Sequence, residues 1–267
     1  MVLPYVAPPD LPGDIQPYAV LLLVAVTAGF FTSLRLGRRA GMATDDLGLL
    51  LGLSIFVAFV AGHVFDVIVY ARDRAAHDPG LWLRMRDGHS LFGALIGVAI
   101  TTVIIARVRK LALAPLADVV ALGFLVATTI GRVGCAVVHD HLGRATDSPF
   151  GVDVPRARLY SMRPYFDGDS PTVRVHDLGL AELVLLVPVT AAAFLLARRR
   201  LPPGRLAALI AITYATVRFG LDFLRHPSVE PRHLGLTVGQ WCCLALAAVA
   251  AVAIRRLAPR QSSGYTR

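Results

Sequence analysis

The chain has 267 residues, of which 55% are hydrophobic and 17% charged, and its formal net charge is +9. So apolar a composition excludes an ordinary soluble domain and indicates a helical protein that crosses a membrane several times. The positive charge does not indicate nucleic-acid binding, because the cations stand in short clusters between apolar segments, as charges beside membrane-spanning helices do.

Seven apolar segments are each close to the ~20 residues that a membrane-spanning helix needs. We predict spans at 17–36, 46–70, 89–107, 112–134, 178–197, 205–224 and 234–254. The residues before the first segment include Asp10 and Asp14 and no Lys or Arg, so we expect a true span there and not a cleaved signal peptide. The predicted fold class is therefore all-α, a single seven-helix membrane domain over 1–267.

Short basic clusters predict the orientation of the spans. They follow the first, third and seventh segments and flank the connection between the fifth and sixth: Arg35, Arg38, Arg39, Arg107, Arg109, Lys110, Arg198–Arg200, Arg205, Arg255, Arg256 and Arg260. All fall on one side, which the positive-inside rule makes cytoplasmic, so the N-terminus is expected outside and the C-terminus inside. The connections 71–88, 135–177 and 225–233 face the other side, and the Pro- and Gly-containing middle one predicts an ordered loop or small cap.

Most ionisable side chains within or beside the spans lie near their predicted outer ends. They are His63, Asp66, His89, Arg132, Glu182, Arg218, Asp222 and Arg225, whereas Asp118 lies nearer the opposite end and is interpreted as structural. Charges at such depth usually face a cavity and mark a functional site. Arginines at the edge of lipid suit a substrate that carries phosphate.

Two interpretations of the sixth span stay open. Arg218 and Asp222 are four residues apart and share a helical face, so they either neutralise each other inside the bundle or contact substrate. Arg132 has no carboxylate nearby in sequence for two turns and lies where a helix ends, which favours a substrate contact. The segment His139-Asp140-His141 is compatible with zinc, but no third ligand follows at a typical spacing, so no metal is expected.

The segment from Gly131 to Arg144 resembles the signature of the prolipoprotein diacylglyceryl transferase family, Gly-Arg-Ile-Gly-Asn-Phe-Ile-Asn-Gly-Glu-Leu-aromatic-Gly-Arg. Both Gly-Arg pairs and the acidic position, Asp140, keep their spacing. Other positions that match the family follow in order: Tyr18, Asp118, His176, Glu182, Tyr214, Arg218, Asp222, Arg225 and Gln240. The chain also departs from the family: Cys135 replaces an asparagine, and Phe92 stands where the family has a catalytically important histidine. Asp140 and Asp222 stand where the family has Glu, and the segment from His176 to Glu182 lacks the family's Pro-Ser-Gln interior.

The resemblance implies a multi-pass enzyme of the bacterial inner (plasma) membrane, without a cofactor, that acts in lipoprotein maturation. Its partners would be membrane lipids and lipobox-containing prolipoproteins, with the diacylglyceryl group of phosphatidylglycerol transferred to the lipobox cysteine thiol. We expect Arg132 and Arg218 to hold the phosphate, oriented by Asp140 and Asp222. The other substrate-binding candidates are Arg144 or Arg225 for the head group, with Tyr18, Tyr214, His176, Glu182 and Gln240 by family position.

The reaction also needs a base, because a thiol with a pKa near ~8.5 is mostly protonated at neutral pH. His89, about one turn before Phe92, is the predicted replacement for the missing histidine, with His63 and His139 as other candidates. Three functions stay open: a working transferase, a homologue with an altered acceptor or only lipid binding, and a small-solute transporter. The Phe92 substitution is the main reason for the second, and the gathering of charges at one end disfavours the third.

Overall fold

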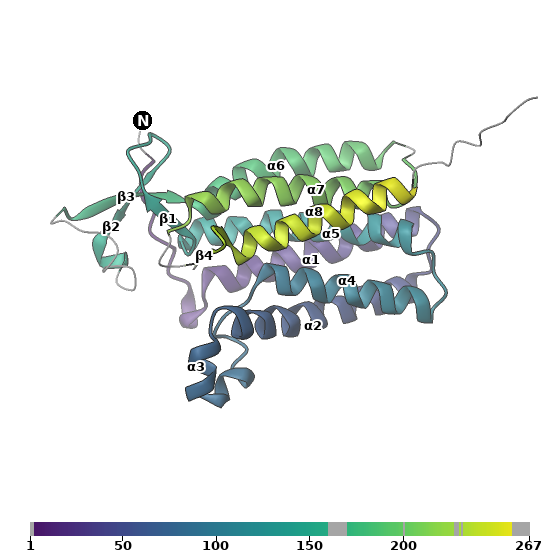
Figure 1. Cartoon of the computed structure of the whole chain (residues 1–267), viewed down its shortest axis with the longest axis horizontal. Coiled ribbons are helices and arrows are strands. Elements are labelled where there is room, and N and C mark those ends of the chain that lie inside the picture. The colour runs from purple at the N-terminus through teal and green to yellow at the C-terminus, as the bar shows by residue number, and fades with distance from the viewer. Residues whose placement is uncertain (1–2, 160–169, 200, 227–229, 231, 258–267) are drawn as a thin grey trace, which may run out of the picture.

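The part of the chain that the structure describes contains seven long helices, which run side by side along the long axis of the molecule (Figure 1). The computed structural model describes residues 3–159, 170–199, 201–226, 230 and 232–257. The long helices are α1 Pro17–Arg39, α2 Thr44–Val69, α4 Leu91–Val108, α5 Leu113–Val138, α6 Leu178–Ala197, α7 Arg205–Leu221 and α8 Val238–Leu257. All seven are long and apolar enough to span a membrane, which confirms the predicted all-α polytopic fold. The third spanning helix, α4, begins two residues later than predicted, and His89 therefore lies just before it.

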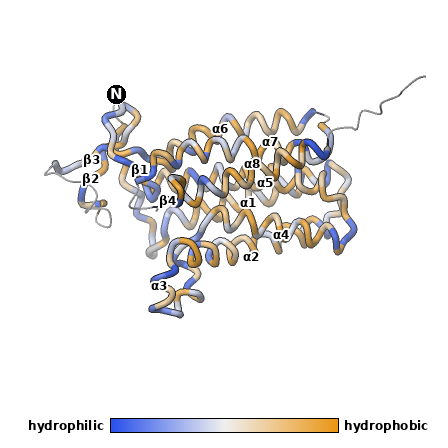
Figure 2. The backbone as a smooth tube through the Cα atoms, viewed as in Figure 1, coloured by the Kyte–Doolittle hydropathy of each residue, from blue (hydrophilic) through white to orange (hydrophobic). Residues whose placement is uncertain are grey.

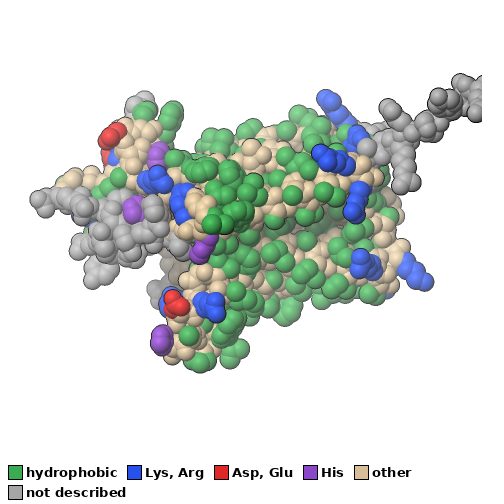
Figure 3. All heavy atoms as spheres, in the orientation of Figure 1, with side chains coloured by type: hydrophobic (Ala, Val, Ile, Leu, Met, Phe, Trp, Pro, Cys, Tyr) green, Lys and Arg blue, Asp and Glu red, His purple; other side chains and the backbone are tan. Residues whose placement is uncertain are grey.

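The surface of the bundle matches its composition. Apolar residues dominate the helices along their length (Figure 2), and hydrophobic side chains cover most of the visible face of the bundle (Figure 3). Phe31, Phe56 and Val249 are between 60% and 69% exposed, as side chains facing lipid are. Arg and Lys side chains cluster at the end of the bundle where α1, α4 and α8 end in basic turns, and others lie at the opposite end, where Asp, Glu and His side chains are also visible (Figure 3). The predicted clustering is therefore present, while the side of the membrane it faces stays a prediction.

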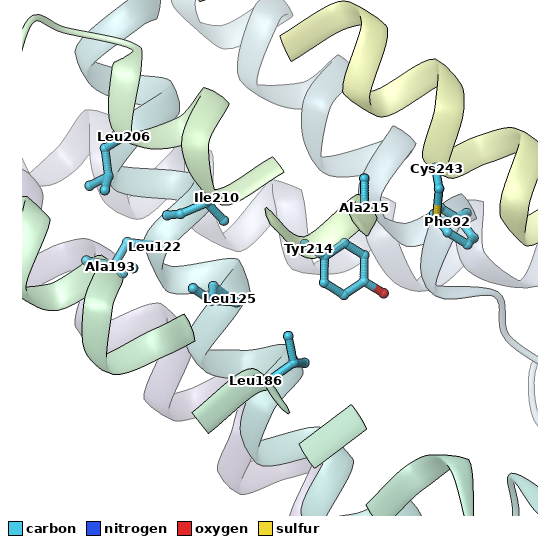
Figure 4. Packing of buried hydrophobic residues seen from close by; sticks show 10 residues of the cluster. All are labelled: Phe92, Leu122, Leu125, Leu186, Ala193, Leu206, Ile210, Tyr214, Ala215 and Cys243. Carbon is cyan, nitrogen blue, oxygen red and sulfur yellow. The ribbon is translucent and has the colours of Figure 1, made fainter. Parts of the chain in front are cut away.

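The bundle is held by close helix contacts at glycines and by an apolar core. A Cβ added at Gly29 of α1 would lie 2.6 Å from the carbonyl oxygen of Gly123 on α5, and one at Gly123 would lie 2.7 Å from that of Gly29. Because glycine has no side chain, the backbones of α1 and α5 can approach each other this closely. Figure 4 shows the buried cluster beside them, which α5, α6 and α7 build together with Phe92 of α4 and Cys243 of α8.

The connections opposite the basic end form short elements. The connection after α2 carries α3 Arg72–His77 and the 3-10 turn η2 Pro79–Leu83, while η1 Pro12–Asp14 precedes α1 and η4 Asp222–Leu224 follows α7. The expected cap at 135–177 contains a three-stranded antiparallel sheet in the order β1-β3-β2, with β1 Leu142–Ala145, β2 Val152–Pro155 and β3 Thr172–Asp177. A small apolar core of Val152, Val154, Leu159 and Val175 stabilises it. Finally, β4 Arg232–His233 pairs with β5 Leu236–Thr237 just before α8.

The contacts of Asp118 confirm that its role is structural. Its two carboxylate oxygens accept the backbone N–H groups of Gly204 and Ala207, each at 2.7 Å. These groups belong to the N-terminus of α7, where backbone donors have no partner within the helix. Asp118 therefore caps a neighbouring helix and stays far along α5 from the charged residues described next.

Candidate active site

A buried carboxylate joins the two arginines that the sequence singles out. Glu182 of α6 is fully buried, and its Oε2 lies 3.1 Å from Nε of Arg132 on α5 and 2.8 Å from Nη1 of Arg218 on α7. The hydroxyl of Tyr214 donates to Oε1 of the same carboxylate at 3.4 Å. Three helices thus bring two guanidiniums together, because a carboxylate buried this deeply needs charged or hydrogen-bonding partners.

A second carboxylate continues the cluster towards the end of the bundle. Oδ1 of Asp222 lies 3.0 Å from Nη2 of Arg218 and 3.0 Å from Nε of Arg225, and its Oδ2 accepts from Thr237 Oγ1 at 2.8 Å. Arg225 also pairs with Glu230 at 2.9 Å. The predicted pairing of Arg218 with Asp222 is therefore present. Glu230 was not predicted, since in sequence it is one carboxylate in a loop with no local partner.

This cluster borders one large cavity of about 710 Å³. Its polar wall includes Arg132, Arg218, Arg225 and Glu230. Its apolar wall comes from the middle of the helices: Val26, Phe30, Leu51, Ile55, Val98, Val120 and Phe124. The volume lies in the range of small-molecule sites, and the cavity is charged at one end and apolar along its depth.

The structure separates the predicted site residues into three groups. Tyr18, His89, Arg132, Asp140, Arg218 and Arg225 line the cavity. Glu182, Asp222 and Tyr214 are not among its lining residues: Glu182 and Asp222 hold the guanidiniums by the contacts given above, and Tyr214 donates to Glu182. Arg144, His176 and Gln240 are not among its lining residues, so the structure gives no support to their expected contact with substrate.

Each of these last three has another place in the fold. Arg144 on β1 donates through Nε to the backbone oxygen of Arg225 at 3.2 Å, and His176 lies on β3 beside Gly143. Gln240 forms a capping box at the start of α8, since its Oε1 accepts from Thr237 N and its own N donates to Thr237 Oγ1, both at 3.0 Å. The Thr-x-x-Gln spacing before an apolar segment is the signal that could have identified this role from sequence.

The predicted orientation of Arg132 by Asp140 is wrong. Among the described residues, Glu182 is the carboxylate that pairs with Arg132, whereas Asp140 Oδ1 lies 2.5 Å from Nδ1 of the next residue, His141. The left-handed turn at His139, with φ of 52°, ends α5 and directs the chain away from the helix axis at this point. An acidic residue after that turn contacts its neighbour more readily than a side chain two helical turns back.

The four histidines that could supply a base have different surroundings. His89 lines the cavity, stacked at 4.3 Å against Phe59, and Phe92 lines the same cavity. His63 is buried with its ring nitrogens 3.0 and 3.1 Å from the carbonyl oxygens of Gly88 and Leu81. His139 lies 2.5 Å from Asp177, outside the cavity lining. His141, which was not predicted as a base, lines the cavity beside Asp140.

Cys135, Asp140 and His141 bring one sulfur, one oxygen and one nitrogen within 4.8 Å of one another, as ligands of a metal ion would. Arg132 opposes that use, because its Nη1 lies 3.4 Å from the sulfur and places a fixed positive charge at the site. The arrangement suits a negatively charged group or a thiol better than a cation.

Comparisons with known proteins agree with this geometry. A family model described as prolipoprotein diacylglyceryl transferase matches residues 10–256. The chain is 29% identical over 232 residues to the phosphatidylglycerol–prolipoprotein diacylglyceryl transferase of Chromohalobacter salexigens, covering 86% of this chain and 81% of that one. It is similar to proteins of the same name from Leifsonia xyli subsp. xyli, at 28% identity with 95% and 78% covered, and Ligilactobacillus salivarius, at 29% with 92% and 90% covered.

Proposed function

The chain belongs to the prolipoprotein diacylglyceryl transferase family, whose members are membrane transferases of lipoprotein maturation, and we propose that its cavity binds phosphatidylglycerol for transfer to a prolipoprotein thiol. The protein is a multi-pass membrane enzyme of this kind. In this proposal it resides in the bacterial inner membrane, with the charged end of the cavity on the outer side, where the acceptor cysteine arrives.

The observation that carries the proposal is the meeting of Arg132 and Arg218 at the wall of one cavity. A guanidinium has five N–H donors. In contacts with the described residues, Arg132 is ion-paired with Glu182 and donates to Cys135 Sγ, whereas Arg218 donates to Glu182 and is ion-paired with Asp222. Donors therefore remain on both side chains for a phosphate, which binds best to planar, fixed guanidiniums.

The shape of the cavity suits a lipid of this type. A phospholipid has an anionic head group and apolar chains, and the cavity has guanidiniums at one end and apolar side chains from α1, α2, α4 and α5 along its depth. Arg218 and Arg225 lie at the end of α7 and just after η4, and Figure 1 places that end of α7 at the same end of the bundle as α3 and the sheet. A head group bound there keeps the acyl chains within the bundle.

The chain's residues support the transfer step by electrostatics. The acceptor sulfur bonds to the glyceryl carbon as the bond from that carbon to the phosphate oxygen breaks. The electron pair leaves with the oxygen, so glycerol phosphate departs with its negative charge. Arg132 and Arg218 stabilise the charge as it develops, because Glu182 and Asp222 already hold them in place and no reorganisation is needed.

Transfer in reconstituted vesicles tests the proposal. We expect vesicles with labelled phosphatidylglycerol, the wild-type protein and a lipobox peptide to yield the thioether peptide and glycerol phosphate. Arg132→Ala should lower the rate by at least about 10²-fold, the typical loss for one charge-stabilising donor. Arg174→Ala is the matched control, because Arg174 pairs with Asp153 on the exposed face of the cap.

Three outcomes would contradict the proposal. Full transfer by Arg132→Ala would remove the role of that arginine in leaving-group stabilisation. Lipid binding without product in the wild-type protein would indicate a lipid-binding homologue instead. Equal losses in Arg132→Ala and Arg174→Ala would show that the effect does not come from the cavity.

A further inference from the structure

We propose that His141, positioned by Asp140, is the base that accepts the proton of the incoming thiol. The inference rests on the transfer reaction proposed above. It assigns the proton-accepting role to a residue that neither the sequence patterns nor the family positions had indicated. It also accounts for the loss of the histidine position now occupied by Phe92, which lines the same cavity.

The backbone holds His141 at the edge of the cavity. His139 turns the chain at the end of α5, and Leu142 begins β1 opposite Asp177 of β3. The backbone oxygen of His141 accepts from Leu178 N, the first residue of α6, at 2.9 Å. The imidazole is therefore supported on both sides by regular structure, which keeps a catalytic group in one orientation.

The contact with Asp140 decides which ring nitrogen is available. Because Nδ1 lies 2.5 Å from the carboxylate oxygen, Nδ1 carries the hydrogen and Nε2 keeps a free electron pair. The thiol proton moves to Nε2 as the sulfur bonds to the glyceryl carbon. The carboxylate of Asp140 then stabilises the imidazolium, as the acidic member of a catalytic triad does.

The sulfur of Cys135 shows that there is room for a sulfur atom beside His141. Sγ of Cys135 is within 4.8 Å of ligand atoms of Asp140 and His141, and it lies 3.4 Å from Nη1 of Arg132. The space beside His141 therefore also adjoins the guanidinium proposed to hold the phosphate. A thiol that reaches this base is thereby brought next to the carbon it attacks.

The surroundings of His141 leave its ring neutral near pH 7. Partial burial lowers the pKa of His141, and the positive charges of Arg132 and Arg225 lower it further, while Asp140 raises it. The charged and titratable groups that act on it or lie beside it are Arg132 and Cys135 on α5, Asp140 just after α5, Glu182 on α6 and Arg225 after η4. A neutral imidazole is the form that can accept a proton.

The other candidates lack this combination. His63 and His139 do not line the cavity, and the ring nitrogens of both contact other groups of the fold. His89 lines it, but among the described residues no carboxylate pairs with its ring, which stacks on Phe59. Only His141 lines the cavity with a carboxylate bonded to its ring, among the histidines that the structure describes.

The test is the pH dependence of transfer in the vesicle assay, with His141→Gln compared with His77→Gln on exposed α3. A thiol with a pKa near ~8.5 is about 3% ionised at pH 7, so His141→Gln should lose about 30-fold there. Its rate should then rise with the ionised fraction of the thiol, by about tenfold per pH unit below the thiol pKa and levelling off above it, and come within about threefold of wild type at pH 9.5. His77→Gln should follow the wild-type profile throughout.

Asp140→Asn adds a readout that a merely structural role would not give. Removing the carboxylate lowers the pKa of the imidazole, so the fall in rate at acidic pH should move to lower pH. A wild-type profile for His141→Gln would overturn the proposal, as would a uniform loss that high pH does not restore. If His89→Gln, and not His141→Gln, loses activity at pH 7 and regains it at high pH, His89 is the base.

Arg132→Ala separates this inference from the proposed function. Its loss should persist at pH 9.5, because ionising the thiol does not replace a phosphate ligand. If Arg132→Ala transfers normally while His141→Gln shows the pH rescue, the phosphate role fails and the base assignment stands. If Arg132→Ala is inactive and His141→Gln is unaffected, the base assignment fails and the proposed function stands.

Discussion

Replacing Glu182 with glutamine tests whether Glu182, Arg132 and Arg218 form a buried network of ion pairs. The substitution keeps the size of the side chain and an oxygen acceptor, and removes only the negative charge. Glu182 is fully buried, and its Oε2 is 3.1 Å from Arg132 and 2.8 Å from Arg218. Arg218 keeps Asp222 at 3.0 Å, whereas Arg132 loses the carboxylate that pairs with it in the described part of the chain.

The expected cost follows from these contacts. Removing one partner of a buried ion pair costs about 3–5 kcal/mol, because the other charge stays buried without compensation. We therefore expect Glu182→Gln to lower the free energy of unfolding by about 3–5 kcal/mol.

Unfolding of the purified protein in mixed micelles, titrated with a denaturing detergent and followed by tryptophan fluorescence, measures this change. Asp153→Asn is the matched control, because Asp153 pairs with Arg174 at 2.8 Å while both side chains are about one-third exposed. Such an exposed pair contributes about 0–1 kcal/mol. A loss below about 1 kcal/mol in Glu182→Gln, equal to the control, would refute a buried network.

Two further predictions concern the bundle and its cap. Gly123→Ala places a methyl group 2.7 Å from the Gly29 carbonyl oxygen. It should therefore lower the free energy of unfolding by about 1–3 kcal/mol in the same detergent titration. The control is Gly52→Ala, whose methyl group meets no atom within 4 Å and should leave the stability unchanged. A neutral response to Gly123→Ala would contradict the close approach of α1 and α5. The hydrogen bond to Asp177 raises the pKa of His139, so this pair stabilises the cap fully below about pH 6.5, and the effect is lost as pH rises through the raised pKa. The thermal midpoint should therefore differ between wild type and His139→Gln at pH 5.5 and converge at higher pH, and a difference independent of pH would count against it.

Much of the membrane architecture could be predicted from the sequence. Helix formation in a bilayer depends on local hydropathy, because every backbone polar group must be satisfied within its own helix. The seven spans were therefore located to within a few residues, as was the clustering of basic residues at one end. The pairing of Arg218 with Asp222 was also predictable, since residues four apart share a face of one helix.

The family resemblance identified important positions but not always their roles. It indicated Glu182, Tyr214 and Gln240 as substrate-binding, whereas Glu182 pairs with the two arginines, Tyr214 donates to Glu182 and Gln240 caps α8. A match to a family position shows that the family uses that residue, but it does not show how. A residue that positions another side chain or caps a helix matches the family in the same way as one that contacts substrate. The distinction needs the distances around each side chain.

The sequence by itself determined the number of membrane-spanning helices and the presence of charge near their ends, because both depend on neighbours along the chain. Tertiary structure decided that Glu182 joins Arg132 to Arg218 and that Asp140 pairs with His141 and not with Arg132. It also decided which histidines reach the cavity. The contacts of Glu182 depend on how α5, α6 and α7 pack, since Arg132 is 50 positions and Arg218 36 positions away from it, and these residues meet only when the bundle closes.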